Sequence, residues 1–203
     1  MADSKFNICS QALVLVGANT ITSFSENTTE SKVANQLYES IVENMLTRSR
    51  WRFAAKQAQL SRSTETPTAR WSAKYSIPSN ALLIHTVTVN DNVIEYDRYQ
   101  DEIHCDASTS DIVVADYTIQ PSEANFPPYF KQALIFELAS LFAGAIARND
   151  SLSTLYQNRA ITQMAIARAQ DSQAQTTRKV DTTRFRNRRN TGSIGTIKAT
   201  VSS

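Results

Sequence analysis

The chain has 203 residues, of which 41% are hydrophobic and 20% are charged, as in ordinary globular domains. A chain of this length buries enough apolar surface to fold without a metal ion or a disulfide as a staple. Its 4 glycines are too few and too scattered for a dinucleotide fingerprint or a phosphate-binding loop, which excludes nucleotide-dependent enzymes.

The formal net charge of +2 is unevenly distributed along the chain. Residues 172–203 carry seven basic residues and one acidic residue, a formal charge of +6, whereas residues 1–171 carry −4. The sequence therefore predicts a mildly acidic body with a basic C-terminal extension. No segment reaches the roughly 18 apolar residues of a membrane span, and the first residues lack a signal-peptide pattern, so we expect no membrane contact.

Two helices are predicted near the N-terminus. Asp3 or Ser4 can cap a helix over residues 4–16, and Gly17 offers a left-handed stop. Asn27 and Glu30 have the spacing of a capping box, and apolar residues at helical spacing follow, which predicts a second helix over residues 29–50. Cys9, in the first helix, and Cys105 show no metal-ligand spacing, so we expect reduced, partly buried thiols and neither a metal nor a cofactor.

The middle of the chain predicts an antiparallel meander. The runs 82–89, 93–99 and 112–119 are rich in β-branched and aromatic residues, as strands are. Asn90, Asp91 and Asn92 lie between the first two runs and tolerate the positive φ angles of a tight hairpin turn. Residues 106–110 form a longer polar turn.

Two further helices are predicted after this sheet. Pro127 and Pro128 mark a helix start, and the helix that follows is apolar nearly all round. Such a helix either lies centrally among other helices or shares its second face with another subunit, and we favour central burial. Asp150 or Ser151 caps a fourth helix to about residue 169 or a turn beyond, with these side chains expected inward: Leu152, Leu155, Tyr156, Ala160, Met164 and Ala167.

These elements predict an α+β fold, a four-helix bundle with a small antiparallel β insertion between helices 2 and 3 and an extended C-terminal tail. Residues 1–52 and 124–171 would form the helical bundle, and residues 53–123 the inserted β subdomain. Residues 172–203 have almost no apolar residues and form a basic extension that cannot fold alone.

No catalytic constellation emerges, so we expect that the protein is not an enzyme. His104 and Cys105 are neighbours on a predicted strand and would point to opposite faces, which argues against a Cys/His dyad, and His85 lies in another strand. Glu39 and Glu43 share a helix face, but ion pairs with the nearby Arg48 and Arg50 explain them better than a pair of glycosidase carboxylates.

The strongest local pattern begins with Arg50, Trp51, Arg52 and Phe53 and ends with Trp71 and Tyr75. With its neighbours it resembles the head-to-tail adaptor, or connector, proteins of tailed bacteriophages, whose members read approximately Trp-x-Phe-Ala, basic residues, then Trp, Tyr and Pro. A more distant likeness is to the tail tubular protein A of short-tailed phages. The resemblance covers residues 4 to about 170 and rests on the following positions: Ala12, Leu13, Gly17, Trp51, Arg52, Phe53, Ala54, Lys56, Leu60, Trp71, Lys74, Tyr75, Ser76, Ile77, Pro78, Pro128, Phe130, Ala133, Leu134, Leu138 and Ala139.

This resemblance implies a structural subunit of the virion neck, assembled in the host cytoplasm. About twelve copies would form a ring beneath the portal protein, receive the tail nozzle or tail tube below and let genomic DNA pass through the channel during packaging and ejection. Trp51, Phe53, Trp71 and Tyr75 are expected in the core or at an interface. The residues expected to bind the portal are Arg178, Lys179, Arg184, Arg186, Arg188 and Arg189.

Two other functions stay open. The basic extension is a common design for contacting phosphates, which makes a nucleic-acid-binding protein the main alternative. A tail-associated peptidoglycan hydrolase is a lesser one, because it would need one carboxylate in an apolar pocket facing a second across a cleft.

Overall fold

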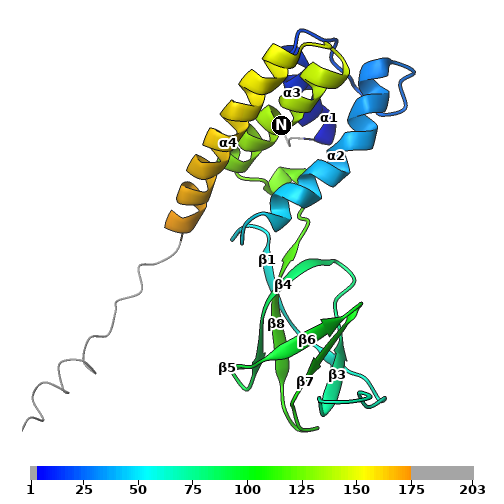
Figure 1. Cartoon of the computed structure of the whole chain (residues 1–203), viewed down its shortest axis with the longest axis vertical. Helices are drawn as coiled ribbons and strands as arrows, with labels where there is room; N and C mark the ends of the chain where they lie inside the picture. The colour runs from blue at the N-terminus through cyan, green and yellow to red at the C-terminus, as the bar shows by residue number, and fades with distance from the viewer. Residues whose placement is uncertain (1–3, 175–203) are drawn as a thin grey trace, which may run out of the picture.

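The structure is a computed structural model, and it describes residues 4–174. Within this range the helices occupy one end of the molecule and the strands the other (Figure 1). The elements in chain order are α1 (Lys5–Leu15), α2 (Thr29–Thr47), β1 (Ala55–Gln59), β2 (Ser61–Arg62), β3 (Ala73–Ser76), β4 (Ala81–Val89), β5 (Asn92–Val93), β6 (Tyr96–Tyr99), β7 (Glu102–Cys105), β8 (Val113–Ile119), a 3-10 turn (Glu123–Asn125), α3 (Pro128–Ala145) and α4 (Asp150–Gln173).

The helix ends follow local capping chemistry. Ser4 caps α1 by accepting the N–H of Asn7 at 3.4 Å, and Gly17 stops this helix with a φ of 74°, as predicted. The predicted capping box is wrong, because Thr28 is the N-cap of α2 and accepts the N–H of Ser31 at 3.2 Å. Asn149 caps α4, in place of the residues predicted for that role.

The third helix is the centre of the helical part, which confirms the prediction of central burial. α1, α2 and α4 all pack on α3, whose larger inward side chains include Phe130, Leu134, Leu138 and Phe142, each at 0% exposure. A helix with neighbours on three sides needs apolar residues nearly all round. Of the described helices, α4 packs along α3 and has no comparable contact with α1 or α2.

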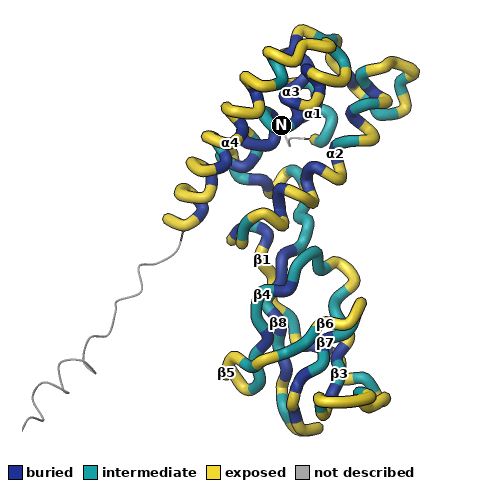
Figure 2. Tube along the Cα trace, in the orientation of Figure 1, coloured by how far each residue is buried: buried dark blue, intermediate teal, exposed yellow. Residues whose placement is uncertain are grey.

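The strands form two four-stranded sheets that face each other across a core of their own. One sheet has the order β1-β8-β4-β5 and the other β2-β3-β7-β6, and the paired strands are antiparallel. The side chains buried between them include Tyr75, Val87, Ile103 and Tyr117. Only Leu60 separates β1 from β2, and only residues 94–95 separate β5 from β6, so the chain passes from one sheet to the other at both edges (Figures 1 and 2).

The predicted fold class, a four-helix bundle with a small antiparallel β insertion, is therefore wrong. The β part is two sheets of four strands each, and the helices surround α3 instead of each packing on two neighbours. The predicted strand 93–99 is two short strands in different sheets, β5 and β6, so the three expected strands do not form a meander. The hairpin turn is correct, because Asn90 and Asp91 have φ angles of 48° and 66°.

Both cysteines are free and fully buried. Burial raises the pKa of Cys9 from 9.0 to about 12, with a further rise from the nearby Glu39 carboxylate, and burial likewise raises the pKa of Cys105 to about 11. An unfolded thiol therefore loses its proton near pH 9 while the folded one keeps it, so the folded state binds more protons above that pH.

We expect the free energy of unfolding to be unaffected by these thiols below pH 9 and to fall as the pH rises from 9 towards 12. The fall would approach about 1.4 kcal/mol per pH unit for each buried thiol. Urea unfolding under reducing conditions at pH 7.5, 9 and 10.5 tests this, with Cys9→Ala as the matched variant. The variant should lose less stability at high pH, and an equal loss would contradict the role of Cys9.

Candidate interaction surfaces

An aromatic cluster joins the end of α2 to the start of α3. Trp51 is fully buried and its indole Nε1 donates to the Met45 carbonyl at 2.9 Å. Its ring lies 5.2 Å from that of Phe130 in an edge-to-face arrangement, and the half-buried Phe53 lies 4.9 Å from the same ring. Trp51 and Phe53 thus fix the turn between α2 and β1 against the helical core.

Asp171, in the last turn of α4, ties this turn to the end of α4. Its carboxylate is 4% exposed; Oδ2 accepts the backbone N–H of Arg52 at 3.0 Å and Oδ1 accepts the hydroxyl of Tyr129 at 2.8 Å. Burial and the bond to this carboxylate raise the pKa of Tyr129 to about 12, so the hydroxyl donates throughout the neutral range. One side chain therefore connects α4, α3 and the α2–β1 turn.

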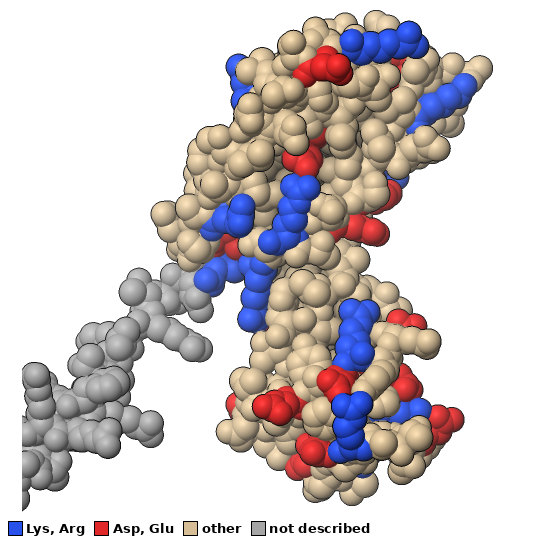
Figure 3. Space-filling view, viewed as in Figure 1, with Lys and Arg blue, Asp and Glu red and all other residues tan. Residues whose placement is uncertain are grey.

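Ion pairs extend the same junction to the sheet. Arg48 Nη2 lies 2.9 Å from Glu137 on α3, and Arg50 Nη2 lies 3.2 Å from Asp116 on β8. The expected local pairs of Glu39 and Glu43 with these arginines are wrong, because Glu39 instead binds Gln120 at 2.9 Å and lies 3.8 Å from Lys5 on α1. Basic side chains gather at this narrow junction between helices and sheets (Figure 3).

Trp71 and Tyr75 lie far along the β part and do not join the Trp51 cluster. Tyr75 is 2% exposed between the two sheets. Trp71 is half-buried and its Nε1 donates to Asp97 at 2.9 Å. Trp51 and Phe53 thus belong to the helical core and Tyr75 to the core between the sheets, whereas Trp71 lies outside both.

The residues considered for catalysis do not converge. His104 lies on the outer side of β7 beside Tyr99, with ring centroids 4.7 Å apart, while Cys105 points into the core. His85, on β4, bonds Thr118 on the neighbouring strand β8 at 2.7 Å. Burial together with the Arg50 charge lowers the pKa of His85, against a smaller opposite effect of Asp116. Within residues 4–174 no group of His, Cys, Asp and Glu side chains could hold a metal ion.

A surface with almost no charge spans α1, α3 and α4, and we call it the uncharged face. It contains two hollows, one of about 460 Å³ between α1 and α3 and one of about 320 Å³ between α3 and α4. Tyr156 lies between them, because its hydroxyl donates to the Leu15 carbonyl at 2.8 Å and its ring stacks on Phe136 at 6.3 Å. The hollows are lined by Asn7, Ser10, Gln11, Val14, Leu15, Thr20, Gln132, Ile135, Phe136, Leu155, Asn158, Arg159, Thr162 and Gln163.

The composition of the uncharged face is that of a protein interface. Arg159 is the one charged residue lining the two hollows, and its guanidinium lies 5.5 Å from the centre of the Tyr156 ring. Val14 is 60% exposed and Leu155 is 45% exposed. Interface cores are depleted in Lys, Glu and Asp, and none of these residue types lines the two hollows. Figure 3 shows broad uncharged areas on the helical end of the molecule.

The sequence predicted neither the exposure of Leu155 nor the burial of Asp171. Leu155 was expected inward but is exposed, because the stripe of α4 that packs on α3 is narrow and consists of Tyr156, Ala160, Met164 and Ala167. Asp171 continues the same stripe four residues after Ala167, and this spacing is the signal that identifies it as a buried position.

The C-terminal residues expected to bind a portal lie outside the described residues: Arg178, Lys179, Arg184, Arg186, Arg188 and Arg189. The described chain ends at Ala174, three residues after Asp171. No helix within residues 4–174 is long and apolar enough to cross a membrane.

Comparison with known proteins adds no identification. No protein-family model matches the chain, and a search of the curated proteins finds no match.

Proposed function

We propose that the protein is a structural adaptor subunit that forms a ring beneath a phage portal, joins head to tail and lines the passage for DNA. The observation that carries this proposal is the uncharged face across α1, α3 and α4. A hollowed face that is nearly without charge and exposes the apolar side chains of Val14 and Leu155 suits a contact with another subunit.

A ring requires two different surfaces on each subunit, because a head-to-tail contact repeats around a closed circle. Ile161, 62% exposed, lies six residues after Leu155 and therefore about 120° away around α4. The helical part thus presents the uncharged face on one side of α4 and a projecting apolar side chain on another. This pairing supports a contact in which Ile161 of one copy enters the uncharged face of the next.

The basic C-terminal segment is the proposed contact to the portal. It follows α4, whose last turn is held in place by Asp171, so the segment would leave each subunit at a fixed point. Its arginines can form paired, charge-assisted hydrogen bonds with acidic or carbonyl groups of a portal subunit. The formal charge of −4 on residues 1–171 suits a channel that passes DNA without retaining it.

The test combines the purified protein with its cognate portal and measures assembly by light scattering and electron microscopy. We expect a stoichiometric ring complex with the full chain. Val14→Lys and Leu155→Lys should abolish ring formation, because each places an unpaired charge in the proposed contact. Both side chains are exposed, so the helix content and the urea midpoint should stay unchanged.

Val93→Lys is the matched control, since Val93 is an exposed apolar residue on β5 at 73% exposure and lies outside the proposed contact. This variant should assemble normally. Normal rings from both face variants would exclude the uncharged face as the subunit contact. No complex between the unaltered protein and the portal would refute the adaptor function itself.

The second candidate is a nucleic-acid-binding protein, and the charge of +6 on residues 172–203 is the observation that favours it. If all seven basic residues engage duplex DNA, the logarithm of the binding constant should fall against the logarithm of the salt concentration with a slope of about −6. Weak binding that survives deletion of residues 175–203 would count against this function.

A further inference from the structure

A second hollow lies on the β part, far from the uncharged face, and we call it the hairpin pocket. It has a volume of about 560 Å³ and lies between the β6–β7 hairpin and the segment that precedes β3. Its walls include Arg70, Arg98, Tyr99, Gln100, Glu102 and His104. Small-molecule sites typically have volumes of about 300–1,000 Å³, so the pocket is large enough for a small ligand or for a side chain of a partner.

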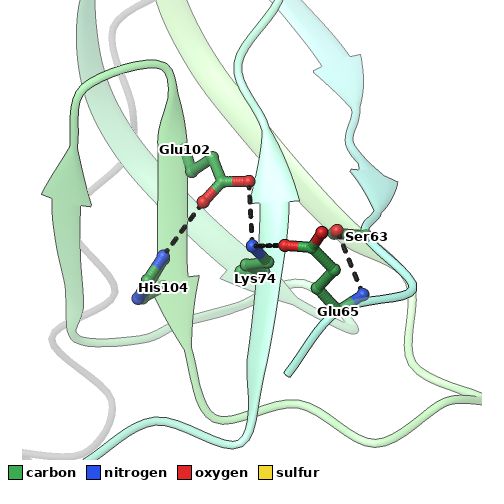
Figure 4. A network of polar contacts seen from close by, with 5 residues as sticks. All are labelled: Ser63, Glu65, Lys74, Glu102 and His104. Carbon is green, nitrogen blue, oxygen red and sulfur yellow. Dashed lines mark hydrogen bonds and ion pairs between the residues drawn. The ribbon is translucent and has the colours of Figure 1, made fainter. Parts of the chain in front are cut away.

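The acidic group on the wall is already paired. Glu102 Oε1 lies 3.4 Å from Lys74 Nζ, and Glu102 Oε2 lies 3.4 Å from His104 Nε2. Lys74 also binds Glu65 at 2.7 Å, as Figure 4 shows. The Lys74 side chain is only 12% exposed, whereas Glu65 is 78% exposed. Glu102 therefore pairs with Lys74 and His104, and no ion pair joins it to Arg70 or Arg98 among the described residues.

The two arginines are placed by the backbone around them. Arg98 Nε donates to the Gln100 carbonyl at 3.1 Å across the two-residue hairpin loop, where Gln100 has a φ of 53°. Arg70 has a φ of 70°, a left-handed conformation that is costly for a residue with a side chain. Within residues 4–174 no hydrogen bond or ion pair occupies Arg70 or the terminal nitrogens of Arg98.

Tyr99 and His104 form the aromatic part of the wall. Tyr99 packs on His104, and its hydroxyl donates to Asp97 Oδ2 at 3.3 Å, the same oxygen that accepts from Trp71 Nε1. Asp97 thus fastens Trp71, and with it the neighbouring Arg70, to the strand that carries Arg98. Arg70 and Arg98 therefore line one hollow on elements that are hydrogen-bonded to each other.

We propose that the hairpin pocket binds an oxyanion, a carboxylate or a phosphate, between Arg70 and Arg98. A guanidinium presents parallel N–H donors that match either group, and paired Arg–oxyanion bonds are among the strongest in proteins. In such a site the left-handed backbone at Arg70 would serve to place a charged side chain at the pocket, where no described residue neutralises it. This binding function is independent of ring formation.

The test is a titration of the full chain, labelled with ¹⁵N, with succinate and separately with inorganic phosphate at constant ionic strength maintained with sodium chloride. We expect saturable shifts of the Arg98 Nε–Hε signal and of the backbone amides of residues 68–70 and 98–104. Succinate binding much tighter than phosphate binding would indicate a carboxylate ligand, and the reverse a phosphate ligand.

Arg70→Gln should weaken the binding at least tenfold without altering the spectrum elsewhere, because this side chain makes no contact that the fold needs. Arg98→Gln should do the same. Arg148→Gln, between α3 and α4, is the matched control that should bind normally, because Arg148 is exposed and has a left-handed φ of 49°, like Arg70, but lies outside the pocket. Shifts that chloride produces equally well, or that persist unchanged when both pocket arginines are replaced, would overturn the proposal.

Discussion

Replacing Trp51 by alanine is expected to lower the free energy of unfolding by about 3–5 kcal/mol, the usual cost of truncating a buried tryptophan. The indole is fully buried, packs edge-to-face on Phe130 and donates to the Met45 carbonyl. Its loss would leave a cavity at the point where α2, α3 and the first strand meet. Since small domains are stable by about 5–15 kcal/mol, urea unfolding should show a large fall in the midpoint.

Trp71→Ala serves as the control for size and aromaticity. Trp71 is half-buried and belongs to the β part, so we expect a loss of about 1–2 kcal/mol, chiefly from its bond to Asp97. If Trp51→Ala lowered the free energy of unfolding no more than Trp71→Ala does, the result would contradict the conclusion that Trp51 is a main stabilising residue of the helical core.

Replacing Asp171 by alanine is expected to cost about 2–4 kcal/mol, because two partly buried donors lose their acceptor together. The donors are the Arg52 N–H and the Tyr129 hydroxyl, at 3.0 and 2.8 Å. The substitution should also loosen the last turn of α4, so the amides of residues 167–173 should exchange faster with solvent. Urea unfolding and hydrogen exchange measure the two effects.

A double-mutant cycle measures how much the hydrogen bond between Asp171 and Tyr129 contributes to the free energy of unfolding. Tyr129→Phe removes one donor and keeps the ring, so it should cost about 1 kcal/mol alone and less in the Asp171→Ala background. Additive costs would show that the two side chains do not act together. Asp171→Asn retains one acceptor oxygen and should fall between the wild type and Asp171→Ala.

The helices were predictable because their signals are local. Ser4 and Gly17 bracket α1, Pro128 begins α3, and the apolar periodicity of each helix continues for several turns. α2 ends at Thr47, three residues before the predicted end, because residues 48–54 turn towards the sheet. The central position of α3 also followed from its composition, since a helix apolar on all sides needs neighbours on all sides.

The sheets were mispredicted because half of their strands have no strand-like sequence. β1 reads Ala-Lys-Gln-Ala-Gln, with little β propensity, and is extended because it pairs with β8, more than fifty residues away. β7, with Glu102 and His104 on its outer side, likewise pairs with β3, which lies about 30 positions earlier in the chain, in addition to its hairpin partner β6. Long-range pairing of this kind overrides local preference.

The residues of the candidate surfaces likewise divide into those with a local sequence signal and those whose role depends on distant contacts. Trp51 and Phe53 were recognisable as buried aromatic residues, but Asp171 acquires its role only from Arg52 and Tyr129, which lie 119 and 42 positions away. The hairpin pocket likewise joins Arg70 to Arg98 through the Trp71–Asp97 bond. Neither arrangement corresponds to a sequence motif, because each is created by contacts between distant segments.

The passage of the chain from one sheet to the other at both edges has a consequence for solubility. Open sheets expose a row of unpaired backbone groups that can recruit strands from other molecules. Here two of the four edge strands, β2 and β5, are only two residues long, and the other two, β1 and β6, have 5 and 4 residues. At both edges the chain continues directly from one sheet into the facing sheet. The β part therefore offers only short edges as templates for fibril growth, even where many copies are crowded together.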